Sequence, residues 1–202
     1  MSVRDITVII TSFRSGEKIK NCLNSIDGEI KVLLIENSND SNIKKSIEKE
    51  FSNVECILTG ANFGYGKSNN IGLKKVITKY ALILNPDTSL HPTAIENFIK
   101  TAKKITEFAI MGPYIQEEKN NNDKNYLKNS SPIQVTNVRG FAMFLNLSEF
   151  KDVGFFDENF NYDLKNTTII HSHVFEHIYH PHQFMKILNE KIDNNGKISQ
   201  KT

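Results

Sequence analysis

The chain has 202 residues, of which 39% are apolar and 24% are charged, as is ordinary for a globular protein with a sizeable core. The formal net charge of +2 is too small to favour nucleic acid as a partner. No apolar run is long enough to span a membrane, and the first residues lack the apolar stretch of a signal peptide. Cys22 and Cys56 have no metal-type spacing, and we expect two buried thiols in a reducing cytosol. We therefore expect a cytoplasmic protein, with peripheral association with a membrane left open.

Short apolar runs rich in β-branched residues alternate with helical patterns along the first half of the chain. The runs predict five buried strands, at residues 6–10, 31–35, 54–58, 80–84 and 108–111. Apolar residues at helical spacing lie between them, and we predict that Ser41 caps one of the helices and that His91-Pro92 begins another. The alternation predicts the α/β class, with a mostly parallel sheet flanked by helices.

Polar residues gather where the predicted strands end. The four groups are Thr11-Ser12, Glu36 to Ser38, the glycine-rich turn at residues 60–66, and Asn85 to Thr88. Ligands of parallel sheets bind beyond the carboxyl ends of the strands, so the sequence predicts a binding site at this edge.

The second half of the chain changes character twice. Residues 116–134 are rich in Asn, Lys and Ser and predict a surface loop. Apolar residues return at 135–145, which include Arg139-Gly140. The composition shifts again after about Asn161, and residues 171–182 hold five of the six histidines.

Six segments, taken in order, resemble family 2 glycosyltransferases and more closely their rhamnosyltransferase-like branch. They are Thr11-Ser12-Phe13, Ile35-Glu36-Asn37-Ser38, Asn62 to Gly72, Asn85-Pro86-Asp87, Arg139-Gly140-Phe141-Ala142-Met143, and Gly154 to Phe160. The resemblance covers residues 5 to about 160 and implies a GT-A-type fold, the fold of nucleotide-diphospho-sugar transferases. It also implies an inverting transfer of a sugar from a nucleotide-diphospho-sugar donor to a hydroxyl of a glycan or lipid-linked acceptor, in polysaccharide synthesis.

The resemblance implies that Glu36, with Thr11 and Ser12 nearby, binds the base of the donor. The family usually has Asp at the Glu36 position, which leaves the base preference open. The alternative for Glu36 is a solvated loop acid.

The ribose and pyrophosphate are expected to lie against the glycine-rich segment. Gly64, Gly66 and Gly72 permit close approach because they have no side chain, and Asn62 and Asn69 are expected to supply amide donors. The alternative is a helix start that binds no ligand.

A divalent metal, Mg²⁺ or Mn²⁺, is the expected cofactor because the departing diphosphate is negatively charged. By resemblance Asp87 is the metal ligand, and Asn85 occupies the first position of an Asp-x-Asp-type motif, where it is expected to bind ribose or, weakly, the metal. Arg139 is the candidate contact to the diphosphate or the acceptor. The alternatives are turn capping for Asp87 and a surface charge for Arg139.

The catalytic base of the transfer is unassigned. In the family an acidic Glu-Asp pair follows the Gly-Phe-Phe-Asp-Glu-x-Phe segment, and this chain has no such pair after Phe160. Asp157 and Glu158 are poor substitutes by position, and nothing around Asp163 matches. The alternative function is therefore an inactive remnant that at most binds a nucleotide sugar.

We expect two parts, a glycosyltransferase-like domain at 1–160 and a tail at 161–202. The tail resembles a fragment of a class I S-adenosylmethionine-dependent methyltransferase without that family's cofactor loop, or else is irregular. This predicts a chimera in which the glycosyltransferase fold is truncated. His173 to His177 also match the zinc-peptidase pattern H-x-x-E-H, but no third ligand is evident, and adventitious zinc or nickel binding is the stronger alternative.

Overall fold

The computed structural model describes residues 2–113, 132, 134, 135 and 137–158, together with two short antiparallel strands, β7 (Lys191–Ile192) and β8 (Ile198–Ser199). A six-stranded sheet is built from β1 (Ile6–Ser12), β2 (Lys31–Glu36), β3 (Val54–Leu58), β4 (Tyr80–Leu84), β5 (Ile110–Met111) and β6 (Ala142–Asn146). The helices are α1 (Glu17–Asn24), α2 (Ser41–Glu50), α3 (Gly64–Leu73) and α4 (Ala94–Lys104), with short 3-10 turns at η1 (Val3–Asp5) and η3 (Leu147–Phe150).

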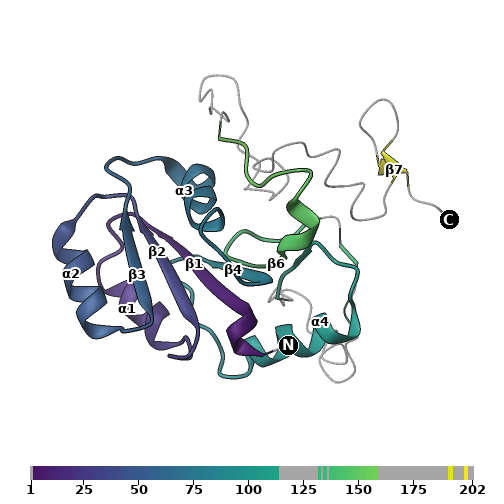
Figure 1. Ribbon diagram of the computed structural model, residues 1–202, viewed down its shortest axis with the longest axis horizontal. Coiled ribbons are helices and arrows are strands. Elements are labelled where there is room, and N and C mark those ends of the chain that lie inside the picture. The colour runs from purple at the N-terminus through teal and green to yellow at the C-terminus, as the bar shows by residue number, and fades with distance from the viewer. Residues whose placement is uncertain are drawn as a thin grey trace, which may run out of the picture.

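The strands lie in the order β3-β2-β1-β4-β6-β5 (Figure 1). The first four are parallel, and β6 runs antiparallel to both β4 and β5. The predicted α/β class with a mostly parallel, helix-flanked sheet is therefore confirmed. The antiparallel direction of β6 is a feature that the sequence pattern did not predict, and β5 is shorter than the predicted strand at 108–111.

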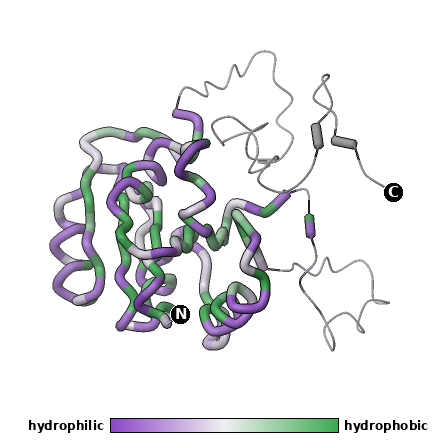
Figure 2. Tube along the Cα trace, turned by 45° about the vertical axis from the view of Figure 1, so that its right-hand side comes forward, coloured by the Kyte–Doolittle hydropathy of each residue, from purple (hydrophilic) through white to green (hydrophobic). Residues whose placement is uncertain are grey.

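Helices cover both faces of the sheet because the strands are apolar on both faces. Val8 and Ile10 of β1 pack toward α1, α2 and α4, whereas Ile9 packs toward α3 and η3. All three side chains are fully buried, as expected for a central strand of a parallel sheet. Figure 2 shows the same division, with hydrophobic strands inside and polar residues on the outer sides of the helices.

Local capping explains where α2 begins. The Asp40 carboxylate accepts hydrogen bonds from the backbone N–H groups of Asn42 (2.8 Å) and Ile43 (3.3 Å), and so satisfies donors that the first turn leaves free. The predicted cap, Ser41, was wrong by one position, because Ser41 is the first helical residue.

The two cysteines are free buried thiols, as predicted. Burial raises the pKa of Cys22 to about 12 and that of Cys56 to about 11, so both remain protonated and unreactive at neutral pH. Among the described residues, no helix combines the length and the apolarity that crossing a bilayer requires.

Close packing between α3 and β1 depends on Gly72. A Cβ atom at Gly72 would lie 2.7 Å from Cγ2 of the fully buried Ile9, closer than real carbon contacts allow. The Ile9 methyl is attached to a β-branched centre with little rotational freedom, so helix and strand would have to separate.

We predict that Gly72→Ala lowers the free energy of unfolding by about 1–3 kcal/mol, because overpacking outweighs the helix propensity of alanine. Urea denaturation followed by circular dichroism measures the change. Gly28→Ala is the matched control, since a Cβ atom there meets nothing within 4 Å. Equal stability of the two variants would contradict the close packing.

Candidate functional site

The polar residues predicted at the strand ends lie at one edge of the sheet. Ser12 at the end of β1 is in register with Glu36 at the end of β2, and Leu84 at the end of β4 is beside Ile10. The backbone N–H of Asn37 donates to the Ser12 carbonyl (2.8 Å), which joins the first two turns beyond the strands. Thr11, Glu36 and Asn85 are therefore neighbours in space although they are far apart in sequence.

Glu36 is fully buried, so it is not a solvated loop acid. Its Oε1 accepts hydrogen bonds from the backbone N–H of Ser38 (2.7 Å) and from the Ser38 hydroxyl. Its Oε2 has no hydrogen-bond partner among the described residues. A buried carboxylate oxygen without a donor is energetically costly, and an N–H group brought in by a ligand would relieve that cost.

Helix α3 is attached to the strand ends by two buried polar side chains. The Ser68 hydroxyl donates to Oδ1 of Asn37 (2.8 Å), just beyond β2. The Thr11 hydroxyl donates to Oδ1 of Asn69 (3.1 Å), and Nδ2 of Asn69 donates to the Tyr65 carbonyl (3.0 Å). Both polar atoms of Asn69 thus have protein partners, and the residue has no exposed surface.

The next residue of α3, Asn70, holds the segment that follows η3. Its Nδ2 donates to the Phe156 carbonyl (2.8 Å), and its Oδ1 accepts from the Phe156 N–H (3.0 Å). Asn70 also donates to the Glu158 carboxylate (3.0 Å), to which Lys74 forms an ion pair (3.0 Å). The hydrogen bond from Asn70 and the Lys74 ammonium lower the pKa of Glu158, which makes that carboxylate a weak base.

The glycines of this segment differ in what surrounds them. Gly64 begins α3 with a φ of +73°, and a Cβ atom there would meet nothing within 4 Å. Gly66 faces protein, because a Cβ atom there would lie 3.3 Å from Cβ of Phe156. Asn62 is exposed, and its Oδ1 accepts from the Gly64 N–H (3.0 Å), which shapes the turn before the helix. Open space for a ligand is therefore at Gly64 and not at Gly66.

The loop after β4 is fixed by the start of β6. The Asn85 N–H donates to the Phe141 carbonyl (2.9 Å), and the Thr88 hydroxyl donates to the same carbonyl (3.3 Å). Asp87 lies between them and is exposed. Burial raises the pKa of Cys22, and the negative charge of Asp87 adds to that effect.

Any metal at this edge would depend on Asp87 together with the ligand. The described residues contain no cluster of three or more His, Cys, Asp or Glu side chains that would hold an ion alone. One exposed carboxylate fits Mg²⁺ or Mn²⁺ when phosphate oxygens of a donor complete the coordination. The predicted histidine cluster and its H-x-x-E-H pattern lie outside the described residues, as does Asp163.

Tyr65 is a contact residue that sequence reasoning did not single out. Its hydroxyl donates to the Gly140 carbonyl (2.6 Å), and its ring meets that of Phe156 edge to face, with centroids 5.7 Å apart. Gly140 follows the exposed Arg139, so Tyr65 connects α3 to the turn that carries this candidate contact residue. A tyrosine within a glycine-rich segment was the available sequence signal.

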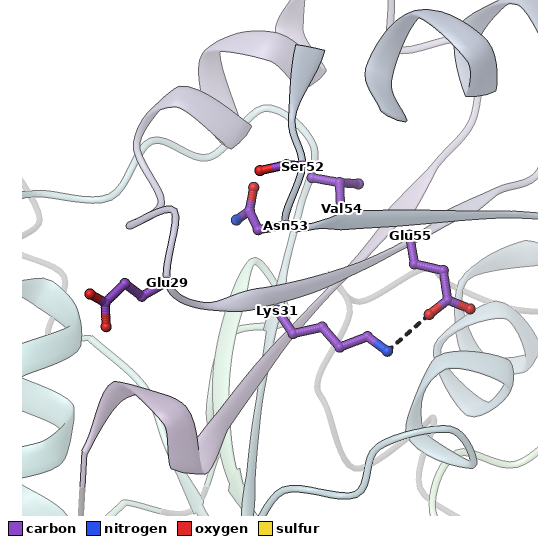
Figure 3. Close-up of a pocket in the computed structure, with 6 residues that line it drawn as sticks. All are labelled: Glu29, Lys31, Ser52, Asn53, Val54 and Glu55. Atoms are coloured by element: carbon purple, nitrogen blue, oxygen red, sulfur yellow. Dashed lines mark ion pairs between the residues drawn. The ribbon is translucent and has the colours of Figure 1, made fainter. Parts of the chain in front are cut away.

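Two surface pockets lie away from the carboxyl ends of the strands. One is lined by residues at the amino ends of β2 and β3, where Lys31 and Glu55 form an ion pair of 2.9 Å (Figure 3). The other lies between α3 and the segment after η3, and Lys74, Phe150 and Phe155 are among its lining residues. Neither includes Thr11, Glu36 or Asp87, so both are distinct from the candidate site at the carboxyl ends of the strands.

Comparison with curated proteins finds two glycosyltransferases. The chain is 24% identical to the low-salt glycan biosynthesis hexosyltransferase Agl10 of Haloferax volcanii, over 77% of this chain and 57% of that protein. It is 21% identical to the N-acetylglucosaminyl-diphospho-decaprenol L-rhamnosyltransferase of Mycobacterium tuberculosis, over 55% of this chain and 41% of that protein. The chain thus spans about half the length of the curated relatives it matches.

Solved structures with the same fold include a mannosyltransferase and a protein that binds UDP-GlcNAc. S. aureus TarS, also solved with UDP-GlcNAc, superposes with a TM-score of 0.60 at 16% identity, over 78% of this chain and 52% of that one. The mannosyltransferase PcManGT of Pyrobaculum calidifontis, in complex with GDP-Man and Mn²⁺, superposes with a TM-score of 0.63 at 12% identity, over 91% and 51%. These superpositions confirm the predicted GT-A-type fold.

The family model described as "Glycosyl transferase family 2" matches residues 7–191, which include all six segments on which the predicted resemblance depends. The match covers most of the chain and runs past residue 160, where the predicted tail begins. The chain belongs to glycosyl transferase family 2.

Proposed function

We propose that this chain is a glycosyltransferase that binds a nucleotide-diphospho-sugar at the carboxyl edge of its sheet and transfers the sugar, with inversion, to a hydroxyl acceptor. The observation that supports this most strongly is the convergence of the turns after β1, β2 and β4 at one edge, with α3 bonded to the first two. TarS with UDP-GlcNAc and PcManGT with GDP-Man share the fold.

The base of the donor is assigned to the Glu36 end of the site. The unpartnered Oε2 of Glu36 is assigned as the acceptor of a ring N–H of the base. Thr11 and Ser12 form the adjoining wall at the end of β1. Asn69 keeps Thr11 in place and does not itself contact the donor, because its side chain is buried and already bonded.

The ribose and diphosphate are assigned to the Gly64 end of α3 and to the Asn85–Asp87 loop. Gly64 leaves open space, and the helix N-terminus favours a negatively charged group there. Asp87 holds Mg²⁺ or Mn²⁺ jointly with the diphosphate, and Arg139 contributes a second positive charge. When bound, the metal neutralises the charge that builds up on the departing diphosphate.

The acceptor is assigned to the glycan or lipid-linked class, since the relatives are named for glycan biosynthesis and for a diphospho-decaprenol substrate. Peripheral membrane association at the cytoplasmic side follows from a lipid-linked acceptor. We further propose that residues 161–202 form a separate part of the chain, which is either a methyltransferase-like fragment or an irregular segment.

A second candidate is a binding-competent chain without turnover. Glu158, the acidic residue nearest to the expected base position among the described residues, is bound by Asn70 and Lys74 and has a lowered pKa. A carboxylate held in this way accepts a proton poorly, which favours the inactive remnant. Transfer from a radiolabelled donor to a lipid-linked acceptor distinguishes the two candidates once donor binding is shown.

We predict that Asp87→Ala abolishes the Mn²⁺-dependent part of UDP or dTDP binding, a loss of at least about tenfold in affinity, because one carboxylate holds the metal. Isothermal titration calorimetry with and without Mn²⁺ measures it. Asp152→Ala is the matched control, an exposed aspartate beyond the opposite end of β6. Unchanged metal dependence in Asp87→Ala would remove Asp87 from the site.

We predict that Glu36→Gln lowers the affinity for UDP by about tenfold and narrows the preference for UDP over CDP, because the carboxylate accepts the ring N–H that uracil has and cytosine lacks. Competition titrations against both nucleotides measure this. Glu55→Gln, an exposed glutamate on β3, is the control. A preference that survives Glu36→Gln would place base recognition elsewhere.

A further inference from the structure

The turn from Arg139 to Phe141 is bonded to two elements of the candidate site. The Phe141 carbonyl accepts from the Asn85 N–H and the Thr88 hydroxyl, which fixes the loop that carries Asp87. The Gly140 carbonyl of the same turn accepts a hydrogen bond from the Tyr65 hydroxyl (2.6 Å). The position of the turn therefore depends on α3 and on the loop after β4 together.

Tyr65 is well suited to hold this turn. Burial raises the pKa of its phenol, so the hydroxyl stays protonated and remains a donor at neutral pH. Its ring packs against Phe156, which Asn70 holds through two backbone hydrogen bonds, so the ring has little freedom to swing. The Tyr65 backbone carbonyl accepts a hydrogen bond from Nδ2 of Asn69, and Oδ1 of Asn69 accepts one from the Thr11 hydroxyl.

These contacts form a chain from β1 through the first turn of α3 to the turn before β6. A phenylalanine at position 65 would keep the ring packing but lose the bond to Gly140. The hydroxyl thus adds one specific interaction, and that interaction ends at the residue next to Arg139. Arg139 is the cation that the resemblance implies at this site, and the diphosphate is the part of the donor that needs a cation.

We propose that the Tyr65 hydroxyl is a positioning group for the diphosphate half of the donor site, acting through Gly140 on Arg139. The proposal rests on the proposed function, since it presupposes a bound nucleoside diphosphate. The base half of the site, at Glu36, is reached from β2 and does not use the hydrogen bond between Tyr65 and Gly140.

The test compares nucleoside diphosphates with monophosphates in the full chain. The affinities of wild type and Tyr65→Phe are measured by calorimetry for UDP with Mn²⁺ and for UMP, and likewise for dTDP with dTMP and GDP with GMP. We expect Tyr65→Phe to weaken the best-bound diphosphate about fivefold, the effect of one hydrogen bond, and to change its monophosphate less than about twofold.

Two further variants separate positioning from a merely structural role. Tyr80→Phe is the matched control, a buried tyrosine at the amino end of β4, and should leave both affinities unchanged. In an Arg139→Ala background the additional effect of Tyr65→Phe should vanish, because the hydroxyl then has no cation to position.

The proposal is overturned if Tyr65→Phe leaves both affinities unchanged, lowers them equally, or keeps its full effect without Arg139. A folded wild-type chain that binds none of the nucleotides would instead refute the donor site, and the role of Tyr65 with it. Wild-type binding that Tyr65→Phe does not alter refutes the Tyr65 proposal alone.

Discussion

The arrangement of the candidate site depends on three consecutive buried polar residues of α3, which point in three directions around the helix axis. Ser68, Asn69 and Asn70 are consecutive buried residues, and each one bonds to a different element: the turn after β2, the end of β1, and the segment at Phe156. A helix that buries polar side chains is unstable unless each finds a partner, so α3 can occupy only the position that satisfies all three. The hydrogen bonds fix the rotation of the helix about its axis.

The opposite requirement, close contact without polar partners, fixes the distance of α3 from the sheet. Gly72 allows the helix to approach Ile9, and Gly66 allows Phe156 to approach the helix. The first turn of α3 therefore lies at the carboxyl ends of the strands, with open space at Gly64. Gly66 and Gly72 therefore serve packing, and Gly64 leaves space for a ligand. The three glycines do not share one role in ligand contact.

The strands, the α/β class and the polar turns that meet at one edge of the sheet followed from local patterns, because buried parallel strands and the polar turns after them can be recognised residue by residue. Contacts between residues that are distant in sequence could not be predicted in the same way. The sequence did not show that Asn69 would be consumed by Thr11 and Tyr65, that Tyr65 would reach Gly140 some 75 positions away, or that β6 would run antiparallel. Each depends on which side chains meet once the strands are ordered. The cap at Asp40 was missed because neighbouring polar residues were both suitable.

Adjacent residues of α3 hold the end of β1 and the segment at Phe156, and this bears on the proposed transfer. Asn69 faces the end of β1, whereas Asn70 and Lys74 hold Phe156 and Glu158, which in the sequence precede the position where the resemblance implies an acidic pair. Glu158 serves as an anchor in this arrangement, since its carboxylate is neutralised by Lys74 and bonded to Asn70. A base that removes the acceptor proton must be free to receive it, so under the proposed function Glu158 is not that base, whereas donor binding does not require one.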